Sequence, residues 1–338
     1  MTLWRHRLEA LVVKAWYRGA WWLYLLWPLS VLVGWVVSKR RQRAGQAPGL
    51  LRPVVVVGGI TIGGTGKTPV VIALTQRLGE LGFRVGIVSR GYGGSTGGAV
   101  QRVEVGSRAA VVGDEPLLMA RRTGVPVCVG HDRLAAAQQL IATTDVNLVL
   151  SDDGLQHYRL PRDYEIAVID AHRGLGNGHL LPMGPLREPA TRLDSVNWVL
   201  QRNGTDGNRG FSYRLSGFDC RQSGERLAPG DAVTHWQGLT IAAVTGLGQP
   251  EQFFESLEGL GLVITRKAYP DHYALTAEDI EQVDAEIILV TEKDAVKLEW
   301  VDDQRIWVLS ISVDLPEPLV RDLTERLADL GGVSCSTS

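Results

Sequence analysis

Short apolar runs alternate with amphipathic stretches along most of the chain beyond Pro48. This alternation is typical of a mostly parallel sheet that is covered by helices on both faces. The apolar runs predict strands at Val54 to Val57, Arg84 to Ser89, Pro126 to Val129, Asn147 to Leu150, Glu165 to Ile169 and Asn197 to Gln201. Helices are expected between them, notably at Lys67 to Leu81 and Asp132 to Ala142. We therefore expect an α/β fold.

The polar stretch Asn203 to Gly210 (NGTDGNRG) interrupts this alternation and predicts a loop or a flexible connection. The alternation then resumes, and a second, smaller α/β unit is expected. Its predicted strands are Thr240 to Val244, Leu262 to Ala268, Glu286 to Val290 and Arg305 to Ile311. Helices are predicted near Pro250 to Leu260 and Pro316 to Leu330. The predicted division is an N-terminal segment at 1–48, a core at 49–235, the second unit at 236–330 and a frayed tail at 331–338.

The N-terminal segment contains an uncharged apolar run, Ala20 to Val37, with basic residues on both sides. A helix that spans a bilayer needs roughly 20 apolar residues, and Pro28 interrupts a run that barely reaches this length. Tryptophans are concentrated here, and indole rings beside basic side chains favour the headgroup level of a membrane. We expect a helix that lies on, or dips into, the cytoplasmic leaflet. Spanning the bilayer and burial inside the protein are the alternatives.

Composition narrows the class of protein. The chain has 338 residues, of which 45% are hydrophobic and 21% charged, as expected for a globular protein large enough for two domains. A formal net charge of −2 gives no general basic field, so a nucleic-acid partner is not expected. The three cysteines show no CxxC spacing, which disfavours a disulfide framework and a zinc site.

The stretch TIGGTGKTP (Thr61 to Pro69) follows the first predicted strand and resembles a phosphate-binding loop. Against the pattern G-x-x-x-x-G-K-[ST], only the first glycine is missing, where Thr61 stands. The remaining glycines allow backbone amides to face phosphate oxygens, Lys67 can reach the β- and γ-phosphates, and Thr68 offers a hydroxyl to Mg²⁺. The alternative is a glycine-rich turn. The predicted nucleotide-binding residues are Thr61, Ile62, Gly63, Gly64, Thr65, Gly66, Lys67 and Thr68.

An acidic stretch follows the predicted strand that ends at Leu150. The sequence there is Ser151-Asp152-Asp153-Gly154, and a phosphate-binding loop usually has a carboxylate partner at the end of a neighbouring strand. One of these carboxylates would hold Mg²⁺ directly or through water. An Asp-Asp-Gly turn is the alternative.

Five further polar clusters follow along the chain: RGYGG (Arg90 to Gly94), VGDEP (Val112 to Pro116), SDDGLQH (Ser151 to His157), GPLREP (Gly184 to Pro189) and YPDHY (Tyr269 to Tyr273). Together with the basic, tryptophan-rich N-terminus and the glycine-rich loop, this series resembles the tetraacyldisaccharide 4'-kinase family, which phosphorylates a lipid A precursor. The resemblance extends to at least Lys297, and the family shares the departure at Thr61.

This resemblance implies a P-loop kinase core with a smaller C-terminal α/β domain, in a monomer on the cytoplasmic face of the bacterial inner membrane. It implies that Mg·ATP phosphorylates the 4'-hydroxyl of a tetraacyldisaccharide 1-phosphate to form lipid IVA. Asp114 matches the family's general base, and His272 matches the histidine paired with it. From the residues alone, Asp114 would be read as a helix N-cap and His272 as a surface histidine.

The resemblance assigns roles to several other polar residues. Lys67 and Arg187 would stabilise the transferring phosphate, or Arg187 would hold the 1-phosphate of the acceptor. The implied metal ligands are Thr68, Asp152, Asp153 and Glu188, and the implied acceptor-binding residues are Tyr92, Arg133, Gln156 and His157. From the residues alone, Tyr92 could be a packed aromatic, Arg133 a solvated helix residue, and Arg187 with Glu188 an ordinary ion pair in a rigid loop.

The stretch TEKD (Thr291 to Asp294) invites comparison with the guanine-reading motif of GTPases, but its lysine and aspartate are adjacent rather than separated by one residue. ATP is therefore the expected donor. Two interpretations remain open: TEKD begins a turn or helix, or Lys293 reaches the nucleotide from the second unit. Two rival classes also remain, a membrane-bound ATPase that positions other proteins and a GTPase chaperone.

Overall fold

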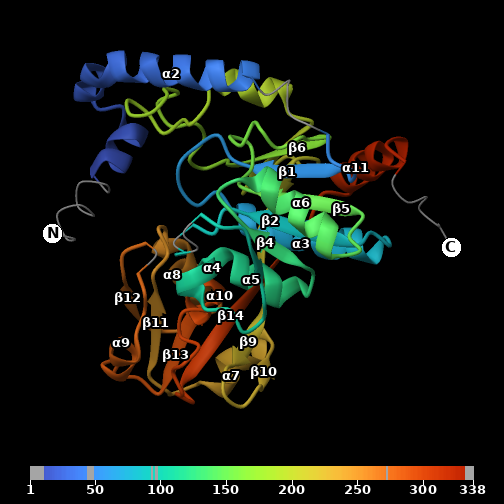
Figure 1. Ribbon diagram of the computed structural model, residues 1–338. Helices are drawn as coiled ribbons and strands as arrows, with labels where there is room; N and C mark the ends of the chain where they lie inside the picture. The colour runs from blue at the N-terminus through green and yellow to red at the C-terminus, as the bar shows by residue number, and fades with distance from the viewer. Residues whose placement is uncertain (1–10, 44–48, 93, 96–97, 272, 332–338) are drawn as a thin grey trace.

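The computed structural model describes residues 11–43, 49–92, 94–95, 98–271 and 273–331 of the chain (Figure 1). Two sheets dominate it. The strands of the first sheet are, in spatial order, β3 (Gln101–Val103), β4 (Val127–Val129), β2 (Val85–Ser89), β5 (Leu148–Asp152), β1 (Val54–Gly58), β6 (Tyr164–Asp170), β7 (Trp198–Arg202) and β8 (Gly210–Phe211). The β3–β4 pair is antiparallel and the other pairs are parallel, so the predicted mostly parallel sheet is confirmed.

Helices cover both faces of this sheet. Strand β1 has four consecutive valines, so it presents apolar side chains to both faces. Val55 and Val57 point into one core, beneath α3 (Lys67–Glu80) and α5 (Asp114–Thr123). The alternate residues of β1 point into a second core, beneath α6 (Arg133–Thr143). A strand buried on both faces carries apolar residues without alternation, which is why the sequence predicted these strands well. The short helix α4 (Ala109–Val112) precedes α5.

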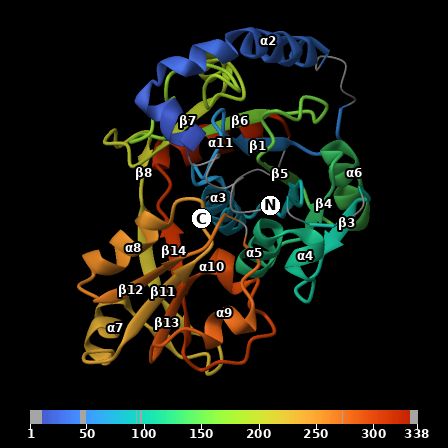
Figure 2. The same cartoon turned by 90° about the vertical axis from the view of Figure 1, so that its left-hand side faces the viewer.

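The second sheet has the spatial order β10 (Arg226–Leu227), β9 (Tyr213–Cys220), β14 (Ile306–Val313), β13 (Ile287–Thr291), β11 (Ile241–Thr245) and β12 (Ile264–Ala268). Strands β11 to β14 are parallel, whereas β9 and β10 add antiparallel pairs at one edge. The accompanying helices are α7 (Pro229–His235), α8 (Pro250–Gly259), α9 (Ala277–Glu281) and α10 (Glu292–Ala295). Figure 2 shows this unit beneath the first.

The division of the chain differs from the predicted one at both ends of the second unit. Strand β9 already belongs to the second sheet, so this unit begins near residue 213 and not near 236. Helix α11 (Glu317–Asp329), predicted as part of the second unit, returns to the first sheet and buries Leu319, Leu323 and Leu327 in its core. Arg77 pairs with Glu317 at 3.2 Å across this contact. Local periodicity identified β14 and α11, but it carries no information on which sheet a helix covers.

The N-terminal segment lies along the outside of the first unit. Residues 11–18 are helical, followed by a 3₁₀ helix (η1, Trp21–Leu26) and α2 (Trp27–Gln42). The Ser30 hydroxyl donates to the Leu180 carbonyl (2.9 Å) and accepts from the Met183 amide (3.0 Å), and Arg41 donates to Ser195 Oγ (2.9 Å). Helix α2 therefore follows the surface of this unit, as Figures 1 and 2 show.

The face of this segment that points away from the protein is apolar. Residues Trp21 to Gln42 form a helix long and apolar enough to cross a membrane, with a mean hydropathy of 1.5, and only 11% of its apolar window is buried. Burial inside the protein, one of the alternatives from the sequence, is therefore not what the structure shows. We call this exposed face the anchor face; its large side chains are Trp21, Tyr24, Leu25, Trp27, Leu29, Val31, Leu32 and Trp35.

The return of α11 to the first sheet can be tested by stability measurements. Leu323→Ala should lower the free energy of unfolding by about 2–5 kcal/mol, because it leaves a cavity in the first core. Glu325→Ala, on the exposed face of the same helix, should change it by less than about 0.5 kcal/mol. Urea unfolding followed by circular dichroism measures both, and equal small effects would contradict this packing.

Candidate active site

The glycine-rich loop connects β1 to α3 as the sequence predicted. Gly63 and Gly66 have φ values of +108° and +96°, a region in which a side chain would be strained. Gly66 is also the N-cap of α3, and a Cβ atom there would collide with the Tyr213 hydroxyl. The loop therefore presents the amino end of α3, where unpaired backbone amides and the helix dipole favour phosphate.

The structure explains why threonine is accepted at the first glycine position. Thr61 forms an isolated antiparallel bridge with Leu186, the Ile62 amide donates to the Pro185 carbonyl (2.9 Å), and the Arg187 amide donates to the Ile60 carbonyl (2.6 Å). The start of the loop is thus extended and paired with the GPLREP stretch. Extended backbone does not require glycine.

Strand β5 lies beside β1 and places two adjacent carboxylates at the loop. Asp152 is the last residue of β5 and pairs with Val57, and Asp153 follows with φ +46°. Asp153 lies 3.7 Å from Lys67 Nζ and accepts from Arg187 at 2.8 and 3.0 Å. Burial alone would raise the pKa of Asp153, but the charges of Lys67 and Arg187 lower it to about 2.

Asp152 has the opposite environment. It is almost fully buried, and its Oδ2 accepts from Ser89 Oγ at 3.1 Å. Burial, followed by the negative charges of Glu115 and Asp153, raises the pKa of Asp152 to about 7. Its Oδ1 is also buried and has no hydrogen-bond partner among the described residues.

An unpaired carboxylate oxygen beside a phosphate-binding loop is the kind of group that Mg²⁺ would satisfy. The described part of the chain holds no group of three or more His, Cys, Asp and Glu residues that could bind a metal alone. Mg²⁺ usually keeps several waters and shares its remaining positions between one or two carboxylates and the phosphates of the substrate.

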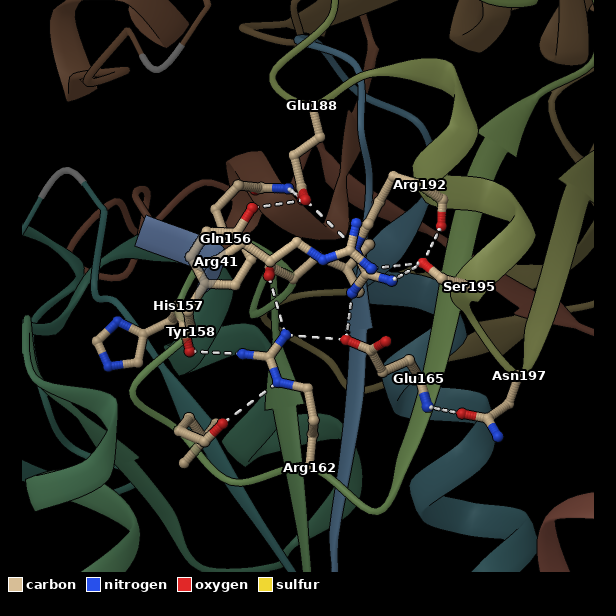
Figure 3. Close-up of polar contacts among 12 residues, drawn as sticks. Arg41, Gln156, His157, Tyr158, Arg162, Glu165, Glu188, Arg192, Ser195 and Asn197 are labelled. Carbon is tan, nitrogen blue, oxygen red and sulfur yellow. Dashed lines mark hydrogen bonds and ion pairs between the residues drawn. The ribbon is translucent and has the colours of Figure 1, made fainter. Parts of the chain in front are cut away.

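Glu188, predicted as a metal ligand, is fully buried in a polar network behind the loop (Figure 3). Its Oε1 accepts from Gln156 Nε2 (2.7 Å), and its Oε2 accepts from the Tyr158 hydroxyl (2.6 Å) and lies 3.2 Å from Arg192 Nε. Both oxygens are therefore engaged by protein groups. Gln156 in turn donates to the Gly59 carbonyl (3.0 Å) and accepts from Arg187 (3.2 Å), so Glu188 orients Gln156.

Sequence reasoning missed Tyr158 and Arg192 in this network. Arg192 also pairs with Glu165 of β6, which Arg162 contacts at 2.9 Å. One local sign was available, since Arg192 stands four residues after Glu188. The partners Glu165 and Arg162 come from another segment, and nothing in the local sequence pattern indicated them.

Arg133 and His157, predicted to bind the acceptor, are close together. Arg133 opens α6, is buried, and donates to the carbonyls of Asp152 (3.3 Å) and Asp153 (3.0 Å), so it is not a solvated helix residue. Its amide donates to His157 Nε2 (3.3 Å). Burial, reinforced by the charge of Arg133, lowers the pKa of His157 to about 4, so this imidazole is neutral near pH 7.

Tyr92 and Asp114 lie on two neighbouring loops. Tyr92 is 63% exposed, and a Cβ atom added at Gly113 would lie 2.8 Å from its carbonyl oxygen. Gly113 is the N-cap of α5, and Asp114 is the first residue of that helix rather than its cap. Asp114 is 6% exposed, and its Oδ1 accepts from the Glu115 amide (3.0 Å). His272 lies outside the described residues, and its pairing with Asp114 stays a prediction.

The TEKD stretch begins a helix, as one of its two interpretations held. The Thr291 hydroxyl accepts from the Asp294 amide and caps α10. Lys293 lies 2.9 Å from Glu115 and 3.9 Å from Asp114, so its ammonium reaches α5 of the first unit. The other interpretation, that Lys293 reaches the nucleotide, stays a prediction.

The second unit also contacts the glycine-rich loop, which the sequence did not predict. Gln249 donates to the Gly64 carbonyl at 3.1 Å. Tyr213, the first residue of β9, packs against Gly66, and its ring lies 5.6 Å from the guanidinium of Arg202. Arg202 forms a buried ion pair with Asp170. The loop is therefore held from both units.

This fold and this site define a P-loop nucleotide-binding protein: a glycine loop leads into a helix that begins with lysine, and carboxylates end the adjacent parallel strand. The family model described as Tetraacyldisaccharide-1-P 4'-kinase matches residues 22–328. The chain belongs to this family.

Individual relatives agree with this assignment. The tetraacyldisaccharide 4'-kinase of Alcanivorax borkumensis is 45% identical over 94% of this chain and 98% of that protein. The corresponding protein of Hahella chejuensis is 41% identical over 95% and 97%. Among solved structures, the "apo" form of LpxK from Aquifex aeolicus in complex with ATP is 26% identical, covers 90% of this chain and 99% of its own, and superposes with a TM-score of 0.75.

The neutral state of His157 gives a test of the site's electrostatics. Its imidazole should titrate near pH 4 in the folded protein and near 6.5 in the unfolded chain. Between these values the unfolded state binds more protons, so the free energy of unfolding should fall as the pH is lowered from about 6.5 to 4. NMR titration, with resonances assigned by a His157→Asn variant, measures the midpoint. A midpoint above pH 6 would contradict the arrangement.

Proposed function

We propose that this chain transfers the γ-phosphoryl group of ATP to the 4'-hydroxyl of a tetraacyldisaccharide 1-phosphate, which forms lipid IVA in lipid A biosynthesis. The observation that carries this proposal is the meeting of Lys67, Asp153 and Arg187 at the mouth of α3, in a member of the 4'-kinase family. The Aquifex aeolicus relative, which shares the fold, is described in complex with ATP.

The chemistry follows from the residues around the loop. The loop amides and Lys67 bind the β- and γ-phosphates, and Arg187 neutralises charge on the transferring group. Asp114 accepts the proton of the 4'-hydroxyl as its oxygen bonds to the γ-phosphorus and the bond to ADP breaks. No covalent enzyme intermediate is needed.

A bound Mg²⁺ would supply positive charge to the phosphate oxygens. Asp152 and Thr68 would hold it: Asp152 Oδ1 is buried and has no protein partner among the described residues, and Thr68 follows the lysine of the loop, where the motif places a hydroxyl for Mg²⁺. Asp153 is already held by Lys67 and Arg187. Glu188 then acts through Gln156, in place of the metal-ligand role that the resemblance implied.

The anchor face supports a site at a membrane surface. Ser30 and Arg41 both bind the stretch between residues 180 and 195, which holds α2 against the first unit along its length. We propose that α2 lies in the cytoplasmic leaflet of the bacterial inner membrane with its apolar side chains among the lipids. The acyl chains of the acceptor can then stay in the bilayer while its sugar reaches the site.

Two variants separate nucleotide binding from proton transfer. Asp114→Ala should lower the rate of phosphoryl transfer by about 10²–10⁴-fold with ATP affinity little changed, because only the base is lost. Lys67→Ala should weaken both. Transfer of ³²P from Mg·ATP to the lipid in detergent measures the rate of phosphoryl transfer, and calorimetry measures the affinity for ATP. Full transfer by Asp114→Ala would exclude it as the base, and ATP hydrolysis without labelled lipid would favour an ATPase.

The role of the anchor face can be tested without removing the helix. Replacement of Leu25, Leu32 and Trp35 by aspartate should abolish flotation with vesicles, because charges at these exposed positions oppose burial in lipid. Trp300→Asp is the matched control, since Trp300 is 77% exposed on the second unit. Transfer to a short-chain, detergent-soluble acceptor should persist in both. Unchanged flotation of the triple variant would mean that another surface binds the membrane.

A further inference from the structure

The two units meet at a cluster of charges around the amino end of α5. Figures 1 and 2 both place α10 beside α5. Lys293 and Lys297, which we call the lysine pair, approach Asp114 Oδ2 at 3.9 and 3.8 Å. Lys293 also binds Glu115 at 2.9 Å. The carboxylate assigned as the base in one unit thus faces two ammonium groups from the other.

Lys297 of the lysine pair also contacts a buried carboxylate, that of Asp294. Lys297 lies 3.2 Å from Asp294, which is fully buried. Asp294 also accepts from the hydroxyls of Thr245 and Thr291, each at 2.7 Å, and from the Gly246 amide at 3.1 Å. These contacts fix Asp294 to the ends of β11 and β13. The side chain of Lys297 is 8% exposed, so its position is set by Asp294 and Asp114.

Other charges act on the same region. Glu115 lies on α5 beside Asp114, and Asp271 acts electrostatically on Lys293. Asp152 feels the charge of Glu115 from the first sheet. Burial lowers the pKa of Lys293, but the charges of Glu115 and Asp114 raise it above its usual range, so Lys293 stays an ammonium. His272 lies outside the described residues.

We propose that Lys297, assisted by Lys293, is a positioning residue for Asp114, and that the TEKDAVK stretch (Thr291–Lys297) serves the base rather than the nucleotide. This inference rests on the proposed role of Asp114. A buried carboxylate tends to take up a proton, and a protonated carboxyl cannot act as a base. Two ammonium groups within 4 Å keep it ionised and fix the direction of its Oδ2.

The test compares Lys297→Met and Lys297→Arg with a matched control. Glu299→Gln cuts the 2.7 Å ion pair between Glu299 and Arg121, which joins the same two units at α5 without touching Asp114. Lys297→Met should lower kcat about tenfold or more, with KM for ATP unchanged. The acid limb of its kcat/KM profile should move up by about one pH unit. Lys297→Arg should restore both, and Glu299→Gln should behave as the parent protein.

A double variant separates action through Asp114 from a general structural effect. In an Asp114→Ala background, Lys297→Met should cost little further activity, because its target is already absent. Equal losses in both backgrounds would overturn the inference. If Lys297→Met proves too unstable to purify, Lys293→Met, whose side chain is 16% exposed, should still move the acid limb upward. An unmoved limb in every folded lysine variant would likewise overturn it.

The outcomes also distinguish the two levels of the proposal. If Asp114→Ala loses transfer but Lys297→Met has the same kcat and pH profile as Glu299→Gln, Asp114 remains the base and the lysine pair does not position it. Full transfer in Asp114→Ala would instead remove the base assignment itself.

Discussion

The parallel pairing of β1 with β5 is the constraint on which the site depends. Both strands are buried on each face of the first sheet, so neither can carry a charge before its end. Their register brings Val57 level with Asp152, so the glycine-rich loop, which begins at Thr61 shortly after β1 ends, starts at the same edge of the sheet as Asp153. A triphosphate bound at the mouth of α3 and the carboxylates of the SDDG turn therefore meet at one edge because two apolar strands lie in register.

Two adjacent aspartates at this edge have opposite properties because their surroundings differ. Asp153 faces Lys67 and Arg187 and remains ionised to a low pH. Asp152 is deeper, bonds to Ser89 through one oxygen and has its pKa raised to about 7. The Glu188 network reaches this region through Gln156, which contacts Glu188, the Gly59 carbonyl and Arg187.

The sequence predicted those parts of the structure that local sequence patterns determine. The central strands β1, β2, β4 and β5 of the first sheet consist mostly of apolar residues, and the glycines at positions 63 and 66 are required by their own backbone angles. What it could not predict depends on partners that are distant along the chain. Strand β9 has mixed burial and joins the second sheet only by pairing with β14, and α11 has the same amphipathic pattern whichever sheet it covers. Arg133 reads as an exposed helix residue until the SDDG turn folds over it.

The path of the chain makes the second unit part of the site. The chain enters this unit at Tyr213 and leaves it after Val313, and these two residues pair directly in the second sheet. The two connections between the units are therefore side by side, and Tyr213 lies against Gly66, the N-cap of the phosphate-binding helix. Gln249 reaches the loop nearby, while Lys293 and Lys297 reach α5. The second unit therefore contacts both the glycine-rich loop and α5, the helix that carries Asp114.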